Sequence, residues 1–365
     1  MMQDAVKVSI IIPVYNAARL LHQALDSALG QTLTEIEVIA VDDCSADGSG
    51  KILAERAAAD PRLRVFTQPE NSGTLSVRRR GIRESRGEYL LFLDPDDFLD
   101  LNTAEELSRL ADGEKASVIH FGTREFKRLA DGSMKPIYDW TPPMNMTVSG
   151  DGEVLRELLR SGRNWSLCFK LIRRDICMKA LDDTEDFFCI MAEDFYFYLA
   201  VSFHAEKLIQ ISRPYYNYDT TIGITSEQAM PPEKFYRMAS LLDALRCAED
   251  FLRQKDLLSD PELADGWEKI ARGQCRILWN QWYSRLAPGD RGKVVEYLFH
   301  KAWDKELFLL SIFDENNYLR ENEEFLKFAS GIYKMLNYIF PKHSFIRLKL
   351  KMWYKKWKYR RQMKK

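Results

Sequence analysis

The chain lacks long hydrophobic runs: no stretch approaches the roughly 18 consecutive apolar residues that a membrane-spanning helix needs. No signal-peptide pattern stands at its start, so we expect a protein that is not exported. Its six cysteines, at positions 44, 168, 177, 189, 247 and 275, show neither the spacing of a metal site nor a paired disulfide framework. This usage fits a reducing cytosol. Fixed-period repeats and low-complexity linkers are also missing.

The most informative stretch that is present spans residues 89–97, with the sequence YLLFLDPDD. An apolar segment of strand length ends there in three carboxylates within four residues, Asp94, Asp96 and Asp97. Clustered carboxylates repel one another, and a hard divalent cation such as Mg²⁺ or Mn²⁺ relieves that repulsion. The alternative is a solvated acidic turn that caps a helix starting near Asn102. Taken alone, this stretch leaves both interpretations open.

The same succession of buried strand and polar punctuation occurs repeatedly before residue 100. Apolar segments at 8–16, 36–41, 63–67 and 89–93 alternate with helical patterns at 17–30, 49–59 and after 71–73. Such alternation predicts an α/β fold with a doubly wound, mainly parallel sheet, whose ligands bind beyond the carboxyl ends of the strands. Length and composition agree, because 365 residues with 46% hydrophobic content suit a catalytic domain of about 220 residues plus an appendage.

These residues resemble the family 2 glycosyltransferases, inverting enzymes of GT-A fold that use nucleotide-diphosphate sugars. The resemblance covers about residues 7–220, in the family's order, and implies a Rossmann-like donor domain, here followed by a C-terminal helical extension. The matching segments are 9–16 (SIIIPVYN), 41–49 (VDDCSADGS), 71–73 (NSG) with Arg78 and Gly81, 87–97 (GEYLLFLDPDD) and Glu193-Asp194.

The resemblance assigns the nucleotide-sugar site to the ends of the first strands and to the basic helix after residue 73. Pro13 and Tyr15 would lie at the nucleobase, where a Tyr ring offers a flat face for stacking, although Tyr15 could instead cap the core. Asp43 would accept a hydrogen bond from the ring N–H of the base, which favours uracil. Asp42 would contribute to the same site or serve only as a turn residue. Arg78 would approach the base or the diphosphate.

The resemblance also implies a divalent cation, Mn²⁺ or Mg²⁺, at the acidic motif. Asp96 and Asp94 would hold the ion and the donor's ribose or sugar, and Asp97 could supply another oxygen. A bound cation suits the reaction, because the leaving nucleoside diphosphate gains negative charge as the glycosidic bond breaks.

A base is needed to deprotonate the acceptor hydroxyl, and the resemblance makes Asp194 that base with Glu193 as its helper. The alternative is ordinary acidic decoration at the start of the helix that follows. Upstream, residues 165–174 resemble the start of the acceptor side, with Trp165 and Lys170 lining the cleft.

Some positions depart from the family pattern. Arg79 stands where a polar amide is usual, and both it and Arg80 could form a solvated helix face. Asp219 occupies the place where an arginine often follows the aromatic run, and Gly223-Ile224 replaces a Gly-Ser pair. The Gln-x-x-Arg-Trp signature of processive polysaccharide synthases is missing, which favours addition of a single sugar.

We expect four segments: a nucleotide-sugar-binding half at 1–110, an acceptor-binding half at 111–228, a helical extension at 229–340, and a basic amphipathic tail at 341–365. The last 24 residues hold eleven Lys or Arg and no acid, with Ile346, Leu350, Trp353 and Trp357 on one helical face. That composition suits an interfacial helix on anionic lipid. A nucleic-acid tail or a solvated tail is the alternative; we favour the membrane and expect no nucleic-acid partner.

The leading hypothesis is an inverting glycosyltransferase, located in the cytoplasm at the inner face of the membrane. It would add one sugar, from a UDP donor above all, to a glycan or glycolipid acceptor such as lipopolysaccharide, lipooligosaccharide, capsule or a lipid-linked oligosaccharide. The alternatives are a degenerate domain that acts as a membrane scaffold, and a phosphoacceptor regulator with an acidic Mg²⁺ pocket. A scaffold would be expected to have lost Asp96 or Asp194, and a regulator needs a single domain of roughly 120 residues.

Overall fold

A computed structural model describes residues 5–129, 131, 133–140, 145–163, 165–221 and 229–311. The basic tail at 341–365 and the Gly223-Ile224 pair lie outside the described residues, so the predictions made for them stay predictions. The chain divides into two compact units, Met1–Ser226 with Ala244–Ala264, and Glu227–Asp243 with Asp265–Lys365.

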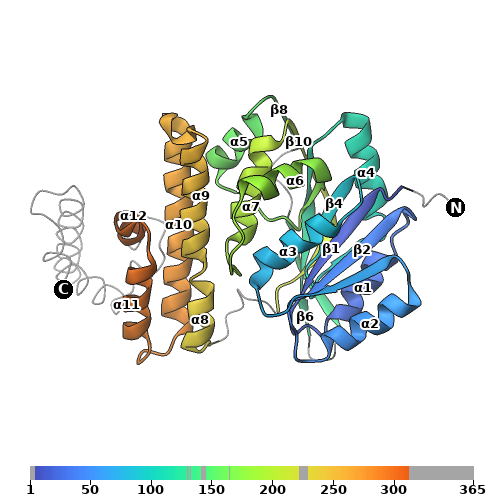
Figure 1. The fold of residues 1–365 in the computed structure, drawn as a ribbon, viewed down its shortest axis with the longest axis horizontal. Coiled ribbons are helices and arrows are strands. Elements are labelled where there is room, and N and C mark those ends of the chain that lie inside the picture. The colour runs from blue at the N-terminus through green and yellow to red at the C-terminus, as the bar shows by residue number, and fades with distance from the viewer. Residues whose placement is uncertain are drawn as a thin grey trace, which may run out of the picture. The chain divides into compact units, whose positions relative to one another are not determined.

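The first unit is built on one mixed sheet with helices on both faces (Figure 1). Its strands are β1 (Val8–Val14), β2 (Ile36–Asp42), β3 (Leu63–Thr67), β4 (Tyr89–Phe92), β5 (Phe98–Leu99), β6 (Val118–Arg128), β7 (Met134–Trp140), β8 (Met146–Ser149), β9 (Lys170–Arg173) and β10 (Lys207–Asp219). Its helices include α1 (Leu21–Leu29), α2 (Ser49–Ala59), α3 (Gly73–Glu84), α4 (Thr103–Glu114), α5 (Glu153–Ser161), α6 (Arg174–Asp183) and α7 (Glu193–His204).

The order of the strands is β3-β2-β1-β4-β9-β6-β10-β5, with β7 beside β6 and β8 beside β10. Strands β3, β2, β1 and β4 are parallel, as are β6 and β10, whereas β9 runs antiparallel between β4 and β6. The predicted doubly wound, mainly parallel α/β fold is therefore confirmed.

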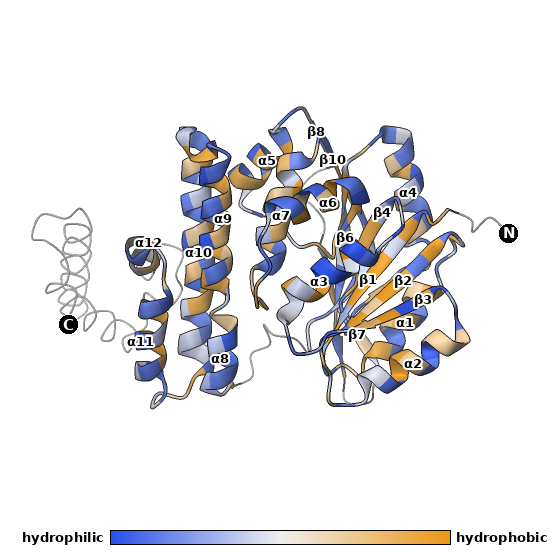
Figure 2. Cartoon of the chain, in the orientation of Figure 1, coloured by the Kyte–Doolittle hydropathy of each residue, from blue (hydrophilic) through white to orange (hydrophobic). Residues whose placement is uncertain are grey.

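Strands β1 and β2 are buried along their whole length, which explains their nearly continuous apolar sequences. Figure 2 shows this as strongly hydrophobic strands in the centre of the sheet. Strand β1 pairs with β4 only from Val8 to Ile11. Pro13 lies two residues beyond the last pair. Since proline has no N–H to donate, its position there costs the β1–β4 ladder no hydrogen bond. The sheet opens at its carboxyl edge just where the polar motifs begin.

The described residues after 228 are helical, as the sequence predicts; among them, those up to Asp243 and from Asp265 on form the second unit. Helices of the C-terminal region are α8 (Pro232–Met238), α9 (Leu241–Gln254), α10 (Pro261–Arg285), α11 (Arg291–Lys301) and α12 (Lys305–Leu310), with a 3₁₀ turn η1 (Leu257–Ser259). Trp279 in α10 stacks on Phe308 in α12 at 4.7 Å between ring centroids, and its indole N–H bonds Ser311 Oγ at 3.1 Å. Buried aromatic residues thus hold this unit together.

Gly81 shows how closely α3 packs on β1. A Cβ at Gly81 would lie 2.5 Å from Cγ2 of Ile11, a side chain that is fully buried in the sheet core. We therefore expect Gly81→Ala to destabilise the protein by about 1–3 kcal/mol in denaturant unfolding, because either α3 or Ile11 must move.

Gly113 supplies the matched control, since it also lies inside a helix, α4, but a Cβ there would meet nothing within 4 Å. Gly113→Ala should leave stability unchanged or raise it by up to about 1 kcal/mol, because alanine favours the helix. Equal effects of the two substitutions would contradict the close packing inferred for α3.

Candidate functional site

The loops after β1 and β2 are joined directly at the carboxyl edge of the sheet. Asn16 and Cys44 both adopt left-handed backbone conformations, with φ of 50° and 63°. The Asn16 side-chain oxygen accepts a hydrogen bond from the Ala46 N–H at 2.9 Å, and the Asn16 N–H donates to Ser45 Oγ at 2.9 Å. Tyr15 is 43% exposed beside this junction, so the alternative that it caps the core is wrong. Its ring is accessible for stacking.

Asp43 is buried and organises the loop that begins α3. Its carboxylate accepts hydrogen bonds from the Ser72 N–H at 2.8 Å, the Ser72 hydroxyl at 2.9 Å, the Gly73 N–H at 2.9 Å and the Asn71 amide at 2.9 Å. These donors use the main acceptor positions of a carboxylate. The predicted contact of Asp43 with a base would therefore have to replace one of them. Asp42, also buried, accepts a hydrogen bond from the Ser45 N–H at 3.2 Å, as a turn residue does.

Arg78 connects the two predicted acidic motifs. It extends from α3, is buried, and donates from Nη2 to Asp94 Oδ1 at 2.8 Å and from Nη1 to Glu193 Oε1 at 3.0 Å. Asp94 follows β4 and Glu193 begins α7, so one guanidinium joins segments about a hundred residues apart in the sequence. Arg78 was predicted to approach the base or the diphosphate; the structure instead gives it two carboxylate partners.

The interpretation of Arg79 and Arg80 as a solvated face is wrong for Arg79 and holds for Arg80, which is exposed. Arg79 is buried. Its guanidinium donates to the Thr184 hydroxyl at 2.6 Å and to the Leu181 carbonyl at 3.1 Å, and these bonds compensate for the loss of water. It fastens α3 to the end of α6.

Asp96 lies in an acidic environment that favours a cation. Burial, with the nearby carboxylates of Asp94 and Asp219, raises the pKa of Asp96 to about 7. The only hydrogen bond recorded for this carboxylate within the described part of the chain comes from its own backbone. A divalent ion would relieve the repulsion and supply the missing positive charge. Asp94 and Asp96 therefore fit the predicted ion.

Asp97 does not fit this role, although it is the neighbouring acid. It is 1% exposed, and its oxygens accept hydrogen bonds from the Tyr216 hydroxyl at 2.7 Å and the Asp219 N–H at 2.8 Å. Burial and the carboxylates of Asp96 and Asp94 raise its pKa. The prediction that Asp97 supplies a metal oxygen is therefore wrong: it ties β10 to the acidic motif.

No group of three or more His, Cys, Asp or Glu side chains is placed to hold a metal among the residues that the structure describes. At nucleotide sites, Mg²⁺ and Mn²⁺ are commonly held by one or two carboxylates, and phosphate oxygens and water complete the shell.

Glu193 and Asp194 occupy the first turn of α7, and the residue before them, Ala192, has a left-handed backbone with φ of 63°. Burial raises the pKa of both carboxyl groups. The two groups also titrate as a pair, because each feels the charge of its neighbours. A carboxyl group with a raised pKa suits proton abstraction better than an ordinary surface carboxylate.

The two predicted acceptor-side residues, Trp165 and Lys170, differ in their burial. Trp165 is half-buried and packs edge-on against Phe195 in α7, with ring centroids 5.7 Å apart. Lys170 is fully buried in β9, where it donates to the Ser166 carbonyl and lies 4.2 Å from the centre of the Tyr198 ring. Burial lowers its pKa to about 7. The prediction that Lys170 lines an acceptor cleft is therefore wrong.

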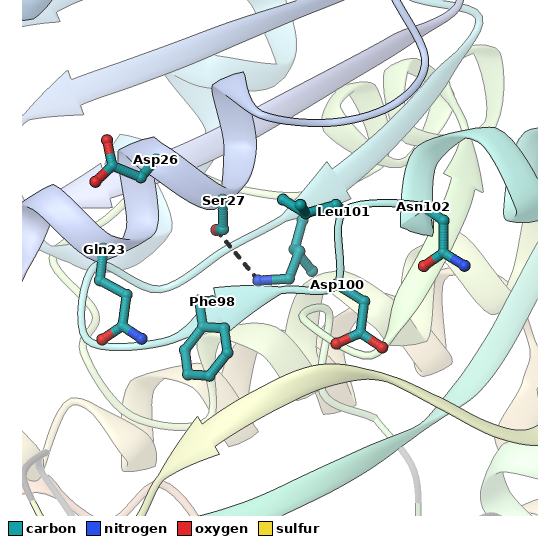
Figure 3. A pocket seen from close by; sticks show the side chains of 8 residues that line it. Gln23, Asp26, Ser27, Phe98, Asp100, Leu101 and Asn102 are labelled. Atoms are coloured by element: carbon teal, nitrogen blue, oxygen red, sulfur yellow. Dashed lines mark hydrogen bonds between the residues drawn. The ribbon is translucent and has the colours of Figure 1, made fainter. Parts of the chain in front are cut away.

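A surface pocket of about 550 Å³ lies between α1 and β5 (Figure 3). None of the predicted donor, metal or base residues lines it. Its wall is formed by Gln23, Asp26, Ser27, Phe98, Leu99, Asp100, Leu101 and Asn102.

Sequence reasoning missed the contribution of β10 to the site. Tyr216 bonds Asp97 and receives the Asp94 N–H at 3.1 Å, and Asp219 bonds Asp97 through its N–H and Arg128 through its carboxylate. The one available signal was Asp219 itself, an acidic residue that follows the aromatic run at a position where the family often has an arginine.

Comparison with known proteins finds similarity to glycosyltransferases. Residues 9–179 match the family model of Glycosyl transferase family 2. The uncharacterized glycosyltransferase EpsJ of Bacillus subtilis is 38% identical over 115 residues, which are 32% of this chain and 33% of that protein. The chain thus spans only about a third of the length of this relative. Cholesterol galactosyltransferase of Borreliella burgdorferi is 24% identical over 364 residues, covering 96% of this chain and 94% of the relative.

Among solved structures, S. aureus TarS 1-349 in complex with UDP-GlcNAc has a TM-score of 0.50 at 19% sequence identity, covering 84% of this chain and 90% of that chain. At this identity the likeness concerns the fold, and it agrees with the sheet described above. Residues 9–179 are therefore similar to the glycosyl transferase family 2 domain, and the first unit has the GT-A fold.

Proposed function

We propose that the protein is an inverting glycosyltransferase that moves one sugar from a UDP-sugar to a hydroxyl of a surface-glycan acceptor. The observation that carries the proposal is the Arg78 bridge, which holds Asp94 of the acidic motif and Glu193 of the candidate base pair on one guanidinium. A donor held at Asp94 and an acceptor held near Asp194 would then meet in one place.

On the donor side, the chain offers an exposed ring at Tyr15 for the base and carboxylates at Asp94 and Asp96 for a divalent ion. Mn²⁺ or Mg²⁺ would neutralise the charge that develops on the leaving nucleoside diphosphate. Asp43 fixes the backbone of residues 71–73 through its hydrogen bonds, which preorganises the start of α3. The bound UDP-GlcNAc of the TarS structure supports a UDP-sugar for this chain.

On the acceptor side, Asp194 would remove the proton of the attacking hydroxyl as the sugar's anomeric carbon is attacked from the face opposite the diphosphate. Glu193 would hold the pair in place through Arg78. Burial raises the pKa of Asp194, which suits a residue that has to take up a proton. Trp165, half-buried beside Phe195, offers an aromatic surface to a sugar ring.

The acceptor proposed is a growing surface glycan, such as lipopolysaccharide, lipooligosaccharide, capsule or a lipid-linked oligosaccharide. The basic tail at 342–365 supports a membrane-linked acceptor, because eleven positive charges and tryptophans on one helical face suit anionic lipid. In the described part of the chain, no helix has the length and apolar character required to cross a membrane.

Asp194→Asn tests the base directly. We expect turnover to fall by about 10²- to 10⁴-fold, the usual contribution of a general base, while UDP affinity stays within about twofold. Steady-state kinetics and calorimetric UDP binding measure the two effects separately. Asp151→Asn, in an exposed turn, is the control and should change neither. Full turnover in Asp194→Asn would exclude this residue as the base.

The pH profile tests the same pair without a substitution. Because burial raises the pKa of Glu193 and Asp194, the base keeps its proton to higher pH than an ordinary carboxyl group. We expect kcat/KM to fall on acidification, with its midpoint above the usual carboxyl value of about 4. An acid limb at or below that value would contradict the raised pKa.

Asp96→Ala tests the ion site. In calorimetric titrations with UDP, GDP, CDP and TDP, we expect UDP to bind to the native chain in the presence of Mn²⁺. This metal-dependent binding should be lost in Asp96→Ala. Asp26→Ala, at an exposed acid on α1, should bind as the native chain does. Binding that is equally strong without the metal, or unaffected by Asp96→Ala, would contradict the proposed ion site.

Vesicle co-sedimentation tests the membrane proposal. Replacing Lys349, Lys351, Lys355, Lys356 and Lys358 by Gln should release the full chain from anionic vesicles, because each basic residue near the surface contributes about 1 kcal/mol. Exposed lysines of the first unit, Lys51 and Lys115, serve as the control positions. Unchanged sedimentation of the tail variant would remove the membrane from the proposal.

A further inference from the structure

Arg128 is a cation that the motif analysis does not assign and that the structure brings to the acidic motif. It lies at the end of β6, and its Nε donates to Asp219 Oδ2 at 3.0 Å. Its Nη2 donates to the Gln23 side-chain oxygen at 2.9 Å. Asp219 in turn donates its N–H to Asp97, directly after the predicted metal ligand Asp96. Two hydrogen bonds therefore connect Arg128 to the acidic loop.

Two other cations near the acidic motif, Arg78 and Lys170, are buried and already have hydrogen-bond partners. Arg78 is buried and donates to two carboxylates, Asp94 and Glu193. Lys170 is fully buried, with the Ser166 carbonyl and the Tyr198 ring as partners. An anionic ligand arriving from solvent would meet neither without first uncovering it.

Arg128 differs in exposure and in its spare donors. Its side chain is 26% exposed, whereas its partner Asp219 is fully buried. Nη1 has no hydrogen-bond acceptor among the residues that the structure describes, so the guanidinium is held at one edge and available at the other. Arginine in this state is well suited to phosphate, because its planar fork can bind two oxygens at once.

We propose that Arg128 binds the diphosphate of the nucleotide donor, with Asp219 and Gln23 as the residues that position it. The inference rests on the proposed function, since it requires a nucleotide-diphosphate donor at Asp96. A guanidinium whose Nη1 donates to the diphosphate would stabilise the negative charge that grows on the leaving group, while Nε stays bonded to Asp219.

Under this proposal, Asp219 holds the Arg128 guanidinium in place. An acid at this position would by itself repel a diphosphate, and it is buried among other acids. Paired with Arg128, its charge is compensated, and it fixes the guanidinium through Nε while Nη1 stays available. The acid is thus a positioning residue, and the positive charge comes from β6.

The test compares ligands with and without phosphate on the full chain, at fixed Mn²⁺ concentration. UDP affinity is measured by calorimetry and uridine affinity by ligand-observed NMR, for the native chain, Arg128→Gln and Arg128→Lys. We expect Arg128→Gln to weaken UDP binding by about 10- to 100-fold and to leave uridine binding unchanged. Arg128→Lys should recover part of the loss, because it restores the charge without the planar fork.

Arg124→Gln is the matched control, since Arg124 lies on the same strand but binds Asp100 through two contacts at 2.9 Å. It should leave both affinities unchanged. Equal weakening of UDP and uridine by Arg128→Gln, or unchanged UDP affinity in both Arg128 variants, would overturn the inference. Failure of the native chain to bind UDP or any other nucleoside diphosphate would instead overturn the proposed function.

Discussion

The candidate site depends on the ion pairs of one buried guanidinium. Arg78 would be costly to bury alone, and Asp94 and Glu193 would repel each other without it. Removing Arg78 would leave two uncompensated carboxylates, whereas removing either acid would leave one ion pair. Helix α3 therefore has to hold its position closely, and it does so through the contact of Gly81 with Ile11 and the hydrogen bonds of Arg79.

Much of the fold was predictable because strands and helices of this class have strong periodic signals. Helix α2 and strand β3 coincide with their predicted ranges, and the polar motifs lie at the carboxyl edge because parallel strands all end there. The partners of individual side chains were less predictable. Asp96 and Asp97 are adjacent acids with opposite environments, and the difference comes from β10, which returns about 120 residues later to supply Tyr216 and the Asp219 N–H.

Lysine and arginine positions were misjudged for a similar physical reason. A charged side chain in a sequence is normally solvated, and only distant partners justify its burial. Lys170 and Arg79 have such partners, a carbonyl and an aromatic ring for the first and a hydroxyl and a carbonyl for the second. Arg128 shows the converse: nothing in the sequence marks this residue at the end of β6, and its role is inferred from the Asp219 carboxylate beside it.

The left-handed residues Asn16, Cys44 and Ala192 have a consequence for protein engineering. Each adjoins a polar motif, and a non-glycine residue in this conformation costs roughly 1 kcal/mol or more. Replacing them by glycine would remove strain but would also loosen the turns that aim Tyr15, Asp43 and Glu193. Stabilising substitutions are better placed in the second unit or at exposed positions of the first unit. The turns that orient the side chains of the site then stay unchanged.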